Sequence, residues 1–370
     1  MLCARACPLL PSLRPRQAMV AAVAAATAAL PAGGVSPPGP PPKRQRQRPT
    51  ADVAADGWPA GFRKWDDVAV RSFESALGID SGGAGVVVDS GAIAKRLAMV
   101  LDFDLTVSKA DVAECHHLIG TDQVMPPAFL EECALLWDVA GDPKHPRRFE
   151  LYGPEDGPER PHAFWNVFHG YMVKHKISAE MVQVAAEAEK TRRGMLLRPG
   201  IRELWALCER HDVPVVILSA GIVQVIEAYC RLDEVELPPN CRVVANSMVF
   251  DRNGCCVDMQ PSVPPCSRVG KLLRLREQSG LLEERPCALL VGDKPIDATM
   301  AKGYPALNGG GVPTTLSFGF LNDEKASDET IAEYEGAFDV IPHSGSECGF
   351  EMVTRILASL LKTHSGTACD

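Results

Sequence analysis

Short apolar runs alternate with amphipathic stretches along most of the chain after about Trp58. The runs of four to eight apolar residues are typical of buried strands, and stretches with apolar residues every three or four positions are typical of helices. The predicted strands cover residues 98–103, 213–218, 243–250 and 287–291, with one more short strand after a turn at 251–254. The predicted helices cover residues 63–77, 199–211, 222–232, 271–279, 297–303 and 350–362. Strands that alternate with helices predict an α/β fold with a doubly wound, Rossmann-like parallel sheet.

One long segment interrupts this alternation directly after the first predicted strand. Residues 110–195 are largely helical by pattern, with apolar periodicity around 128–139 and 178–191. A loop rich in Pro, Gly and charged residues separates these two stretches. The segment therefore reads as a helical insertion between two strands of the sheet.

The first 57 residues differ from the rest in composition. No acidic residue precedes Asp52, and the segment combines arginines, an alanine-rich run over 18–30 and the basic string at 43–48. Acid-free, arginine-rich composition is found in organelle transit peptides, and a basic string can act as a nuclear signal. A disordered tail of biased composition explains the same residues without a targeting role. We expect a cytoplasmic protein, with a mitochondrion or plastid as the alternative.

Charge and cysteine content narrow the possible partners. The formal net charge is −9 over 370 residues, whereas a general nucleic-acid binder presents a basic surface. No apolar run is long enough to span a bilayer. The 13 cysteines are odd in number and include no Cys-x-x-Cys pair, so we expect free thiols in a reducing compartment. Nucleic acid and membrane are therefore not expected partners.

Polar residues follow three of the predicted strands, at the edge of the sheet where ligands bind in such folds. The first group is Asp102 and Asp104, which an extended chain places on the same side. Two neighbouring carboxylates repel each other unless a cation or a proton separates them. Magnesium suits such a site when phosphate is also bound, and a carboxylate can attack phosphorus. A lone Asp after a strand is more often a turn residue or a helix cap.

The second group is Ser219-Ala220-Gly221. A Ser that opens a helix is usually only its N-cap, but the free amides of a helix start also bind phosphate. The third candidate is Lys271, the only lysine between Ser219 and Asp293. A lone lysine is normally a solvated surface residue, and its place in the order of motifs is what marks it.

The fourth group is Gly292-Asp293 with Asp297 four residues later, at a turn from strand to helix. Asp293 could complete a metal site, while Asp297 caps the helix or hydrogen-bonds around that site. Gly-Asp turns occur widely, so this group is informative only beside the others.

Taken in order, the four groups resemble the motifs of the haloacid dehalogenase superfamily of phosphohydrolases. A closer resemblance is to the cytosolic pyrimidine 5′-nucleotidase family, the class III cytosolic 5′-nucleotidases. It rests on Asp102–Ser108 (DFDLTVS), Ser219–Ile222 (SAGI), the hairpin over 243–254, the FGFLND stretch at 318–323 and His169-Gly170. The resemblance implies a phosphatase core over 58–109 and 196–365 and a helical cap domain over 110–195.

The resemblance also implies the role of each site residue. Asp102 is the nucleophile and a magnesium ligand, and Asp104 is the general acid and base and is counted with the metal site. Asp293 completes the metal site, while Thr106 and Asp297 support it from outside. Ser219, Ala220 and Lys271 hold the phosphoryl oxygens. The implied activity is hydrolysis of nucleoside 5′-monophosphates through an aspartyl phosphate, with magnesium as the cofactor. We expect a nucleotide as the small-molecule substrate and a monomeric protein.

Departures from the family pattern concern the substrate. Ala140 stands where the family has a glutamate that reads the base, and Phe168 replaces a serine. Lys294 and Pro295 stand where the family usually has Ser and Gln. The base and the sugar therefore stay open, and Trp137, Phe164, Trp165 and Phe168 could stack on a base or pack as core. A phosphatase of another small phosphomonoester, a phosphotransferase and an inert scaffold of the same fold are the alternatives.

Overall fold

The computed structural model describes residues 62–79, 90–153, 163–260, 285–301, 314–342 and 348–362. The chain divides into two units, residues 1–52 and 53–370, and every described residue belongs to the second. The expectations for the tail at 1–57 and for the helix at 271–279 therefore lie outside the described residues. Within them, no helix is both long and apolar enough to cross a membrane.

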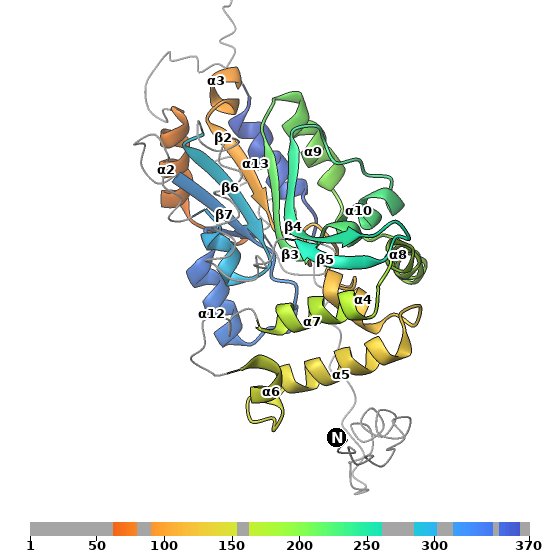
Figure 1. Cartoon of the computed structure of the whole chain (residues 1–370). Coiled ribbons are helices and arrows are strands. Elements are labelled where there is room, and N and C mark those ends of the chain that lie inside the picture. Colours follow the sequence, from red (N-terminus) through yellow and green to blue (C-terminus); the bar gives the residue numbers. More distant parts are fainter. Residues whose placement is uncertain are drawn as a thin grey trace, which may run out of the picture. The chain divides into compact units, whose positions relative to one another are not determined.

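Eight strands form one mostly parallel sheet in the described part of the chain (Figure 1). Their order is β1-β8-β7-β6-β2-β3-β4-β5, and only the outermost pairs, β1–β8 and β4–β5, are antiparallel. The strands are β1 (Phe62–Trp65), β2 (Leu97–Leu101), β3 (Val215–Ile222), β4 (Cys241–Phe250), β5 (Cys256–Gln260), β6 (Cys287–Gly292), β7 (Thr314–Gly319) and β8 (Val340–Pro342). The predicted α/β class and its mainly parallel sheet are confirmed.

The central strand β2 shows why an unbroken apolar run becomes a buried strand. All five of its residues are buried, and it pairs in parallel with β3 on one side and β6 on the other. Met99 and Leu101 belong to a large apolar cluster on one face of the sheet, and Ala98 and Val100 to a second cluster. Both faces of the sheet are therefore covered, as a doubly wound fold requires.

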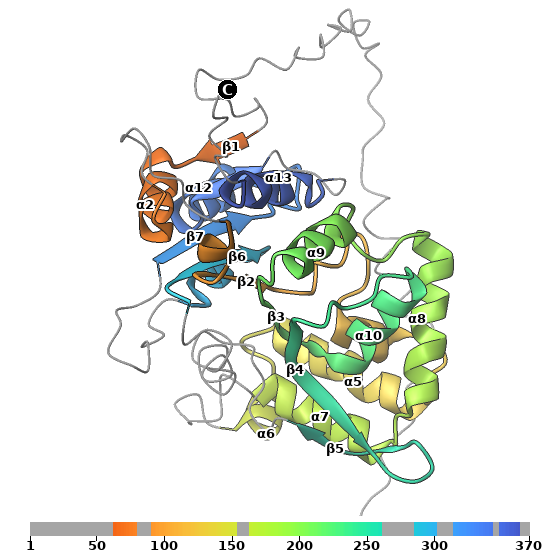
Figure 2. The same ribbon diagram turned by 90° about the horizontal axis from the view of Figure 1, so that it is seen from above.

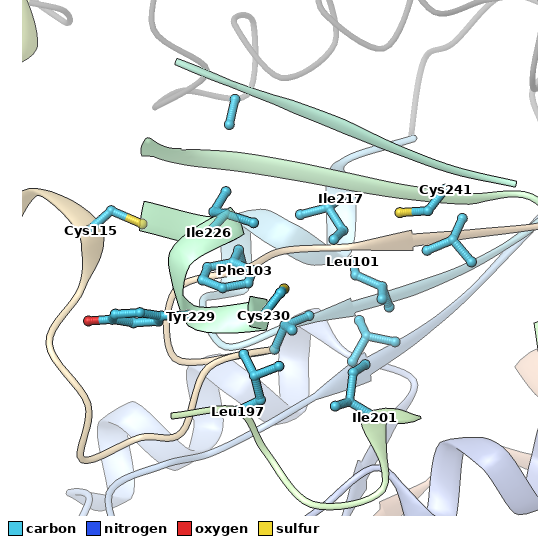
Figure 3. Packing of buried hydrophobic residues seen from close by; sticks show 14 of the residues in the cluster. Leu101, Phe103, Cys115, Leu197, Ile201, Ile217, Ile226, Tyr229, Cys230 and Cys241 are labelled. Carbon is cyan, nitrogen blue, oxygen red and sulfur yellow. The ribbon is translucent and has the colours of Figure 1, made fainter. Parts of the chain in front are cut away.

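Helices outside the insertion pack on or beside this sheet. They are α2 (Asp67–Leu77), α3 (Ser90–Ala94), α9 (Ile201–Arg210), α10 (Val223–Leu232), α12 (Asp328–Ala337) and α13 (Glu351–Leu360). α2 contacts β6 and β7, whereas α10 contacts β3 and β4, and α9 packs on α13 (Figure 2). Side chains of β2, β3 and α10, among them Leu101, Ile217 and Ile226, meet in the large cluster that Figure 3 shows.

The predicted helical insertion between the first two parallel strands is also present. It comprises α4 (Cys115–Thr121), α5 (Pro127–Gly141), α6 (Arg148–Tyr152), α7 (Ala163–Lys174) and α8 (Ala179–Arg193). Figure 1 shows α5, α6 and α7 beyond the lower end of the sheet. α4 contacts β3, and α8 packs on α10. The insertion thus lies next to the carboxyl ends of the central strands, and its predicted domain limits stay a prediction.

Two local expectations differ from the structure. The helix predicted over 63–77 begins only at Asp67, because Asp66 caps it through Oδ1 and the preceding residues pair with β8 as β1. Within the described part of the helix predicted over 297–303, which ends at 301, the structure has the end of a short 3-10 helix, η3 (Pro295–Thr299). Its first residue is a proline, and its N-cap amide donates to the Asp297 side chain, which fixes a tight turn.

The predicted free thiols are confirmed for the described cysteines. Nine are described, and none is in a disulfide. Seven of them are buried: Cys115, Cys133, Cys208, Cys230, Cys241, Cys256 and Cys287. Burial raises the pKa of these thiols, so they behave as small apolar side chains.

Candidate active site

The predicted polar groups converge because β2, β3 and β6 are neighbours in the sheet and run in parallel. A cavity of about 220 Å³ lies at their carboxyl ends. It is lined by Asp102, Asp104, Glu114, His116, His117, Trp137, Phe164, Trp165, Ser219, Ala220, Lys294, Ile296 and Asp297. One part of this lining is carboxylate-rich and comes from the sheet, and another is aromatic and comes from the insertion.

Three buried carboxylates form a tight cluster. Ligand oxygens of Asp102, Asp293 and Asp297 lie within 4.8 Å of one another. Burial raises the pKa of Asp293 well above its usual range, and the neighbouring Asp102 raises it further. Three hard oxygen donors held this close would repel each other without a cation, so the donor set fits a magnesium ion.

The structure distributes the predicted metal residues differently from the expectation. Asp297, expected outside the metal site, lies in the cluster itself. The carboxylate of Asp104, expected in it, is not part of that cluster. Thr106 has the expected supporting position, because its Oγ1 donates to Asp293 Oδ1 at 3.3 Å. A Cβ on Gly292 would lie only 2.2 Å from Asp297 Cβ, so this glycine is what lets Asp297 reach the strand end.

Asp104 has a separate environment. Its Oδ1 accepts a hydrogen bond of 3.0 Å from the backbone amide of Cys115, at the start of α4. Burial raises the pKa of Asp104 from 3.8 to about 7, and Asp102 and Glu114 add to the rise, while hydrogen bonds from Cys115 oppose it. A carboxyl group with a pKa near 7 can both donate and accept a proton at neutral pH.

Ser219 and Ala220 lie at the end of β3 rather than in the first turn of a helix. Ser219 Oγ accepts a hydrogen bond of 2.9 Å from the amide of Gly221 and keeps its own hydrogen for another acceptor. A Cβ on Gly221 would lie 2.7 Å from Cys115 Sγ and 3.0 Å from Asp104 Oδ2. A side chain at position 221 would therefore displace Cys115 or crowd Asp104 and Ser219.

The loop that follows Asp104 is fastened by Arg198, a residue that sequence reasoning missed. Leu105 has a positive φ of 60°. Its carbonyl accepts hydrogen bonds from Arg198 Nη2 at 2.6 Å and from Asn322 Nδ2 at 2.9 Å. Arg198 also donates to the carbonyls of Thr106 at 2.9 Å and Cys348 at 2.7 Å, and to Asn322 Oδ1 at 2.8 Å. One buried guanidinium thus fixes the backbone next to both aspartates.

Two lysines have to be distinguished at this site. Lys271 lies outside the described residues, so its predicted role stays a prediction. Lys294 lines the cavity, and its Nζ lies 3.5 Å from Glu114 Oε2. Burial alone would lower the pKa of Lys294, but Asp293 and Glu114 outweigh it and raise the pKa, so the side chain is a cation. Lys294 belongs to the β6–η3 loop, and Glu114 precedes α4 of the insertion.

Three of the four aromatic side chains considered for stacking on a base are accessible from the cavity. Trp137, Phe164 and Trp165 line the cavity, whereas Phe168 is fully buried behind them. Ala140 is exposed and is not part of the lining. The departure at Ala140 therefore leaves no side chain at the cavity, and the departure at Phe168 fills the core of the insertion.

A pair of buried histidines supports this aromatic part. His116 Nε2 and His169 Nε2 are 3.0 Å apart, and the ring of His116 lies 4.3 Å from that of Trp165. Burial lowers the pKa of both histidines, in the case of His169 to about 4, so both are neutral near pH 7. Glu114, His116 and His117 were not predicted as site residues, although the polar run at the start of the first helix after Asp104 is a signal that could have revealed them.

A larger cavity of about 650 Å³ lies elsewhere, between α9 and α13. Its lining includes Arg202, Glu203 and Arg355 but none of the clustered aspartates. The smaller cavity is the candidate active site because the carboxylates and the neutral histidines converge there.

Comparisons with known proteins identify the family of this chain. The family model "Pyrimidine 5′-nucleotidase (UMPH-1)" matches residues 155–361. A 7-methylguanosine phosphate-specific 5′-nucleotidase from Gallus gallus is 30% identical over 200 residues, which cover 54% of this chain and 64% of that protein, slightly less than two thirds. The Homo sapiens protein of that name is 26% identical over 261 residues, covering 66% of this chain and 79% of its own length.

A solved structure shows the same fold. Cytosolic 5′-nucleotidase IIIB bound to cytidine superposes with a TM-score of 0.59 at 23% identity, covering 81% of this chain and 93% of that chain. The predicted family is confirmed, because the family model spans more than half of the chain. The chain belongs to the pyrimidine 5′-nucleotidase family, and 5′-nucleotidases are phosphoric monoester hydrolases.

Proposed function

We propose that this protein is a magnesium-dependent 5′-nucleotidase that hydrolyses nucleoside 5′-monophosphates to nucleoside and phosphate. The observation that carries the proposal is the cavity that joins the aspartates at the ends of β2 and β6 to the aromatic side chains of the insertion. A phosphate group suits the first part, and a flat base suits the second.

The chemical step begins at Asp102, which lines the cavity. Its carboxylate oxygen attacks phosphorus, and the bond from phosphorus to the nucleoside oxygen breaks. Asp104 gives its proton to the leaving alkoxide. The Asp104 carboxylate then takes a proton from water, the hydroxide attacks the phosphorus of the aspartyl phosphate, and phosphate leaves with Asp102 restored. A pKa of about 7 for Asp104 suits both proton transfers.

Asp102, Asp293 and Asp297 would hold the magnesium ion. When bound, it offsets the negative charge of the carboxylates and of the phosphoryl group. Ser219 and the amide of Ala220 bind phosphoryl oxygens in this proposal, together with the predicted Lys271.

The base is proposed to stack on the aromatic side chains Trp137, Phe164 and Trp165. The names of several relatives specify 7-methylguanosine phosphate, and a positively charged 7-methylguanine ring is attracted to aromatic faces. This makes 7-methylguanosine 5′-monophosphate a specific candidate substrate. A small phosphomonoester without a base is the competing candidate, since the fold and the aspartates alone do not require a base.

The test measures phosphate release from a panel of nucleoside 5′-monophosphates that includes the 7-methylguanosine form, with sugar phosphates as comparison. Wild type, Asp102→Asn and the exposed control Asp328→Asn are assayed with magnesium and with chelator. We expect magnesium-dependent release from nucleotides by wild type and Asp328→Asn, and loss in Asp102→Asn. Release from sugar phosphates alone would support the competing candidate, and no release from any compound would favour an inert scaffold.

Localisation in the cytoplasm and a monomeric state remain part of the proposal. The word "cytosolic" in the names of a Caenorhabditis elegans relative and of the structural neighbour supports the first. Imaging of the full chain and of a chain lacking residues 1–57 separates this from organelle targeting, because only targeting makes the two distributions differ. Light scattering of the purified protein gives its oligomeric state.

A further inference from the structure

The candidate active site has more acidic than basic side chains. Asp102, Asp104, Glu114 and Asp297 line the cavity, and Asp293 adjoins them. Among the described lining residues, Lys294 is the one lysine, and there is no arginine. A phosphomonoester would add close to two further negative charges. The position of this cation therefore matters for whether such a substrate can enter.

The backbone of Lys294 is anchored, whereas its side chain is half exposed and forms an ion pair only with Glu114 among the described residues. Its amide donates to Asp297 Oδ2 at 3.0 Å, which anchors the residue between two aspartates of the carboxylate cluster. The side chain is 54% exposed, and that of its partner Glu114 is 45% exposed. Their 3.5 Å separation and partial hydration make this a weak ion pair. A stronger anion in the cavity can therefore replace Glu114.

We propose that Lys294 is a substrate-binding residue whose ammonium group leaves Glu114 and binds a non-bridging oxygen of the phosphoryl group. This inference rests on the proposed phosphatase function and adds a residue to it. Glu114 acts as a competitor that occupies the lysine when the cavity holds no phosphate.

The alternative role for the same two residues is structural. Lys294 follows β6 of the sheet, whereas Glu114 precedes α4 of the insertion, so the pair also links the two parts of the fold. A purely structural bridge loses the same contact whichever partner is removed. A phosphate-binding lysine responds in opposite directions, because removing Lys294 removes the ligand contact whereas neutralising Glu114 removes its competitor.

The experiment measures binding of inorganic phosphate to the magnesium-loaded full chain by titration calorimetry. We expect Lys294→Met to weaken phosphate binding about tenfold, the lower range for a hydrogen bond to a charged group at a half-exposed site. Lys294→Arg should stay within about threefold of wild type, because it keeps the charge. Glu114→Gln should bind phosphate about two- to threefold more tightly. Lys144→Met, at an exposed lysine outside the cavity, is the matched control and should bind as wild type does.

Unchanged phosphate binding in Lys294→Met would overturn the inference. So would weaker binding in Glu114→Gln to the same degree as in Lys294→Met, since that result indicates a structural bridge. Thermal melting of each variant shows whether it is folded. If Lys294→Met does not fold, the phosphate affinities of Lys294→Arg and Glu114→Gln still decide the test. The assay needs no turnover, so a failed substrate panel and a failed lysine contact are separate results.

Discussion

At the scale of single residues, two carboxyl groups of the candidate active site, Asp104 and Asp293, lie in surroundings that disfavour their charge. Burial raises the pKa of Asp104 to about 7 and that of Asp293 well above its usual range. Each ionised carboxylate therefore costs folding free energy unless a cation or a proton compensates it. The effect of protonation and the effect of metal binding on folding stability can be measured separately.

The variant Asp104→Asn tests the effect of protonation on stability. Because its pKa is higher in the folded chain than in the unfolded chain, the stability linked to it is present at low pH and is lost as pH rises from 3.8 to about 7. In chelator, Asp104→Asn should gain thermal stability relative to wild type as pH rises from 5 to 8. The buried histidines make the opposite contribution to the pH dependence of stability below pH 6.5. Both proteins contain them, so their contribution cancels in the difference between Asp104→Asn and wild type. Differential scanning fluorimetry across this range measures it, and a constant difference contradicts the assignment.

The variant Asp293→Asn tests the effect of magnesium binding on stability. Magnesium should raise the melting temperature of wild type by about 5 °C at a hundredfold excess over its Kd. Asp293→Asn should lose most of this rise, yet be more stable than wild type in chelator because one buried charge is gone. The exposed variant Asp328→Asn should respond to magnesium as wild type does. An equal rise in Asp293→Asn would place the ion elsewhere.

Sequence patterns identify some of these residues and not others for a clear reason. Asp102, Ser219 and Asp293 each follow an apolar run, so their meeting at one sheet edge follows from parallel strands. Arg198 and Glu114 have no such signal, since their contacts with Leu105 and Lys294 join positions 93 and 180 residues apart. The separation of Asp104 from the carboxylate cluster depends on side-chain directions, which the spacing of the two aspartates does not determine.

At the scale of elements, the loop after β2 depends on a distant segment for its conformation. Leu105 adopts a left-handed conformation that costs about 1–2 kcal/mol for a residue other than glycine. Ser108 Oγ accepts its amide hydrogen, and Arg198 and Asn322 hold its carbonyl. The conformation of the loop after β2 is therefore maintained by Arg198, directly before Pro199, together with Asn322.

We predict that Arg198→Lys lowers both the stability of the protein and the alignment of the aspartates, and that the two effects can be measured separately. A lysine cannot serve the carbonyls of Leu105, Thr106 and Cys348 together, so unfolding free energy should fall by about 2–4 kcal/mol. The kcat should fall about a hundredfold, because the aspartates lose their alignment. Denaturant unfolding and steady-state kinetics measure the two effects. Arg202→Lys, an exposed neighbour on α9, should change neither, and an unchanged kcat in Arg198→Lys would mean that the loop keeps its shape without the clamp.

The periodic elements were the predictable ones. Helices α9, α10 and α13 lie within two residues of their predicted limits, because each has a regular apolar face and clear end signals. β1 was missed, since its four residues gain their pairing only from β8, some 275 residues later. The 3-10 turn at Pro295–Thr299 was missed as well, because the Asp297 side chain bonds the backbone there and competes with an ordinary helix.

At the scale of the whole described sheet, strand order determines where chemistry can occur. The chain leaves β2 for the insertion and returns as β3 beside it, while β6 pairs on the other side of β2. This is the point where neighbouring connections diverge and a crevice opens. Alternation of strands and helices predicted the class of fold, but the antiparallel pairings at both edges depend on long-range partners that local patterns do not reveal.

The buried free thiols described above can report when their part of the protein opens to solvent. Cys115 and Cys133 lie in the insertion, whereas Cys208 and Cys287 lie in the sheet and its helices. A membrane-impermeant alkylating agent can modify them only when their region opens, so peptide-resolved mass spectrometry would yield one opening rate for each part. We expect magnesium with phosphate to slow modification of Cys115, next to Asp104, far more than that of Cys208. The opening of the candidate active site can thus be followed with a native cysteine, without introducing a labelling site by mutation.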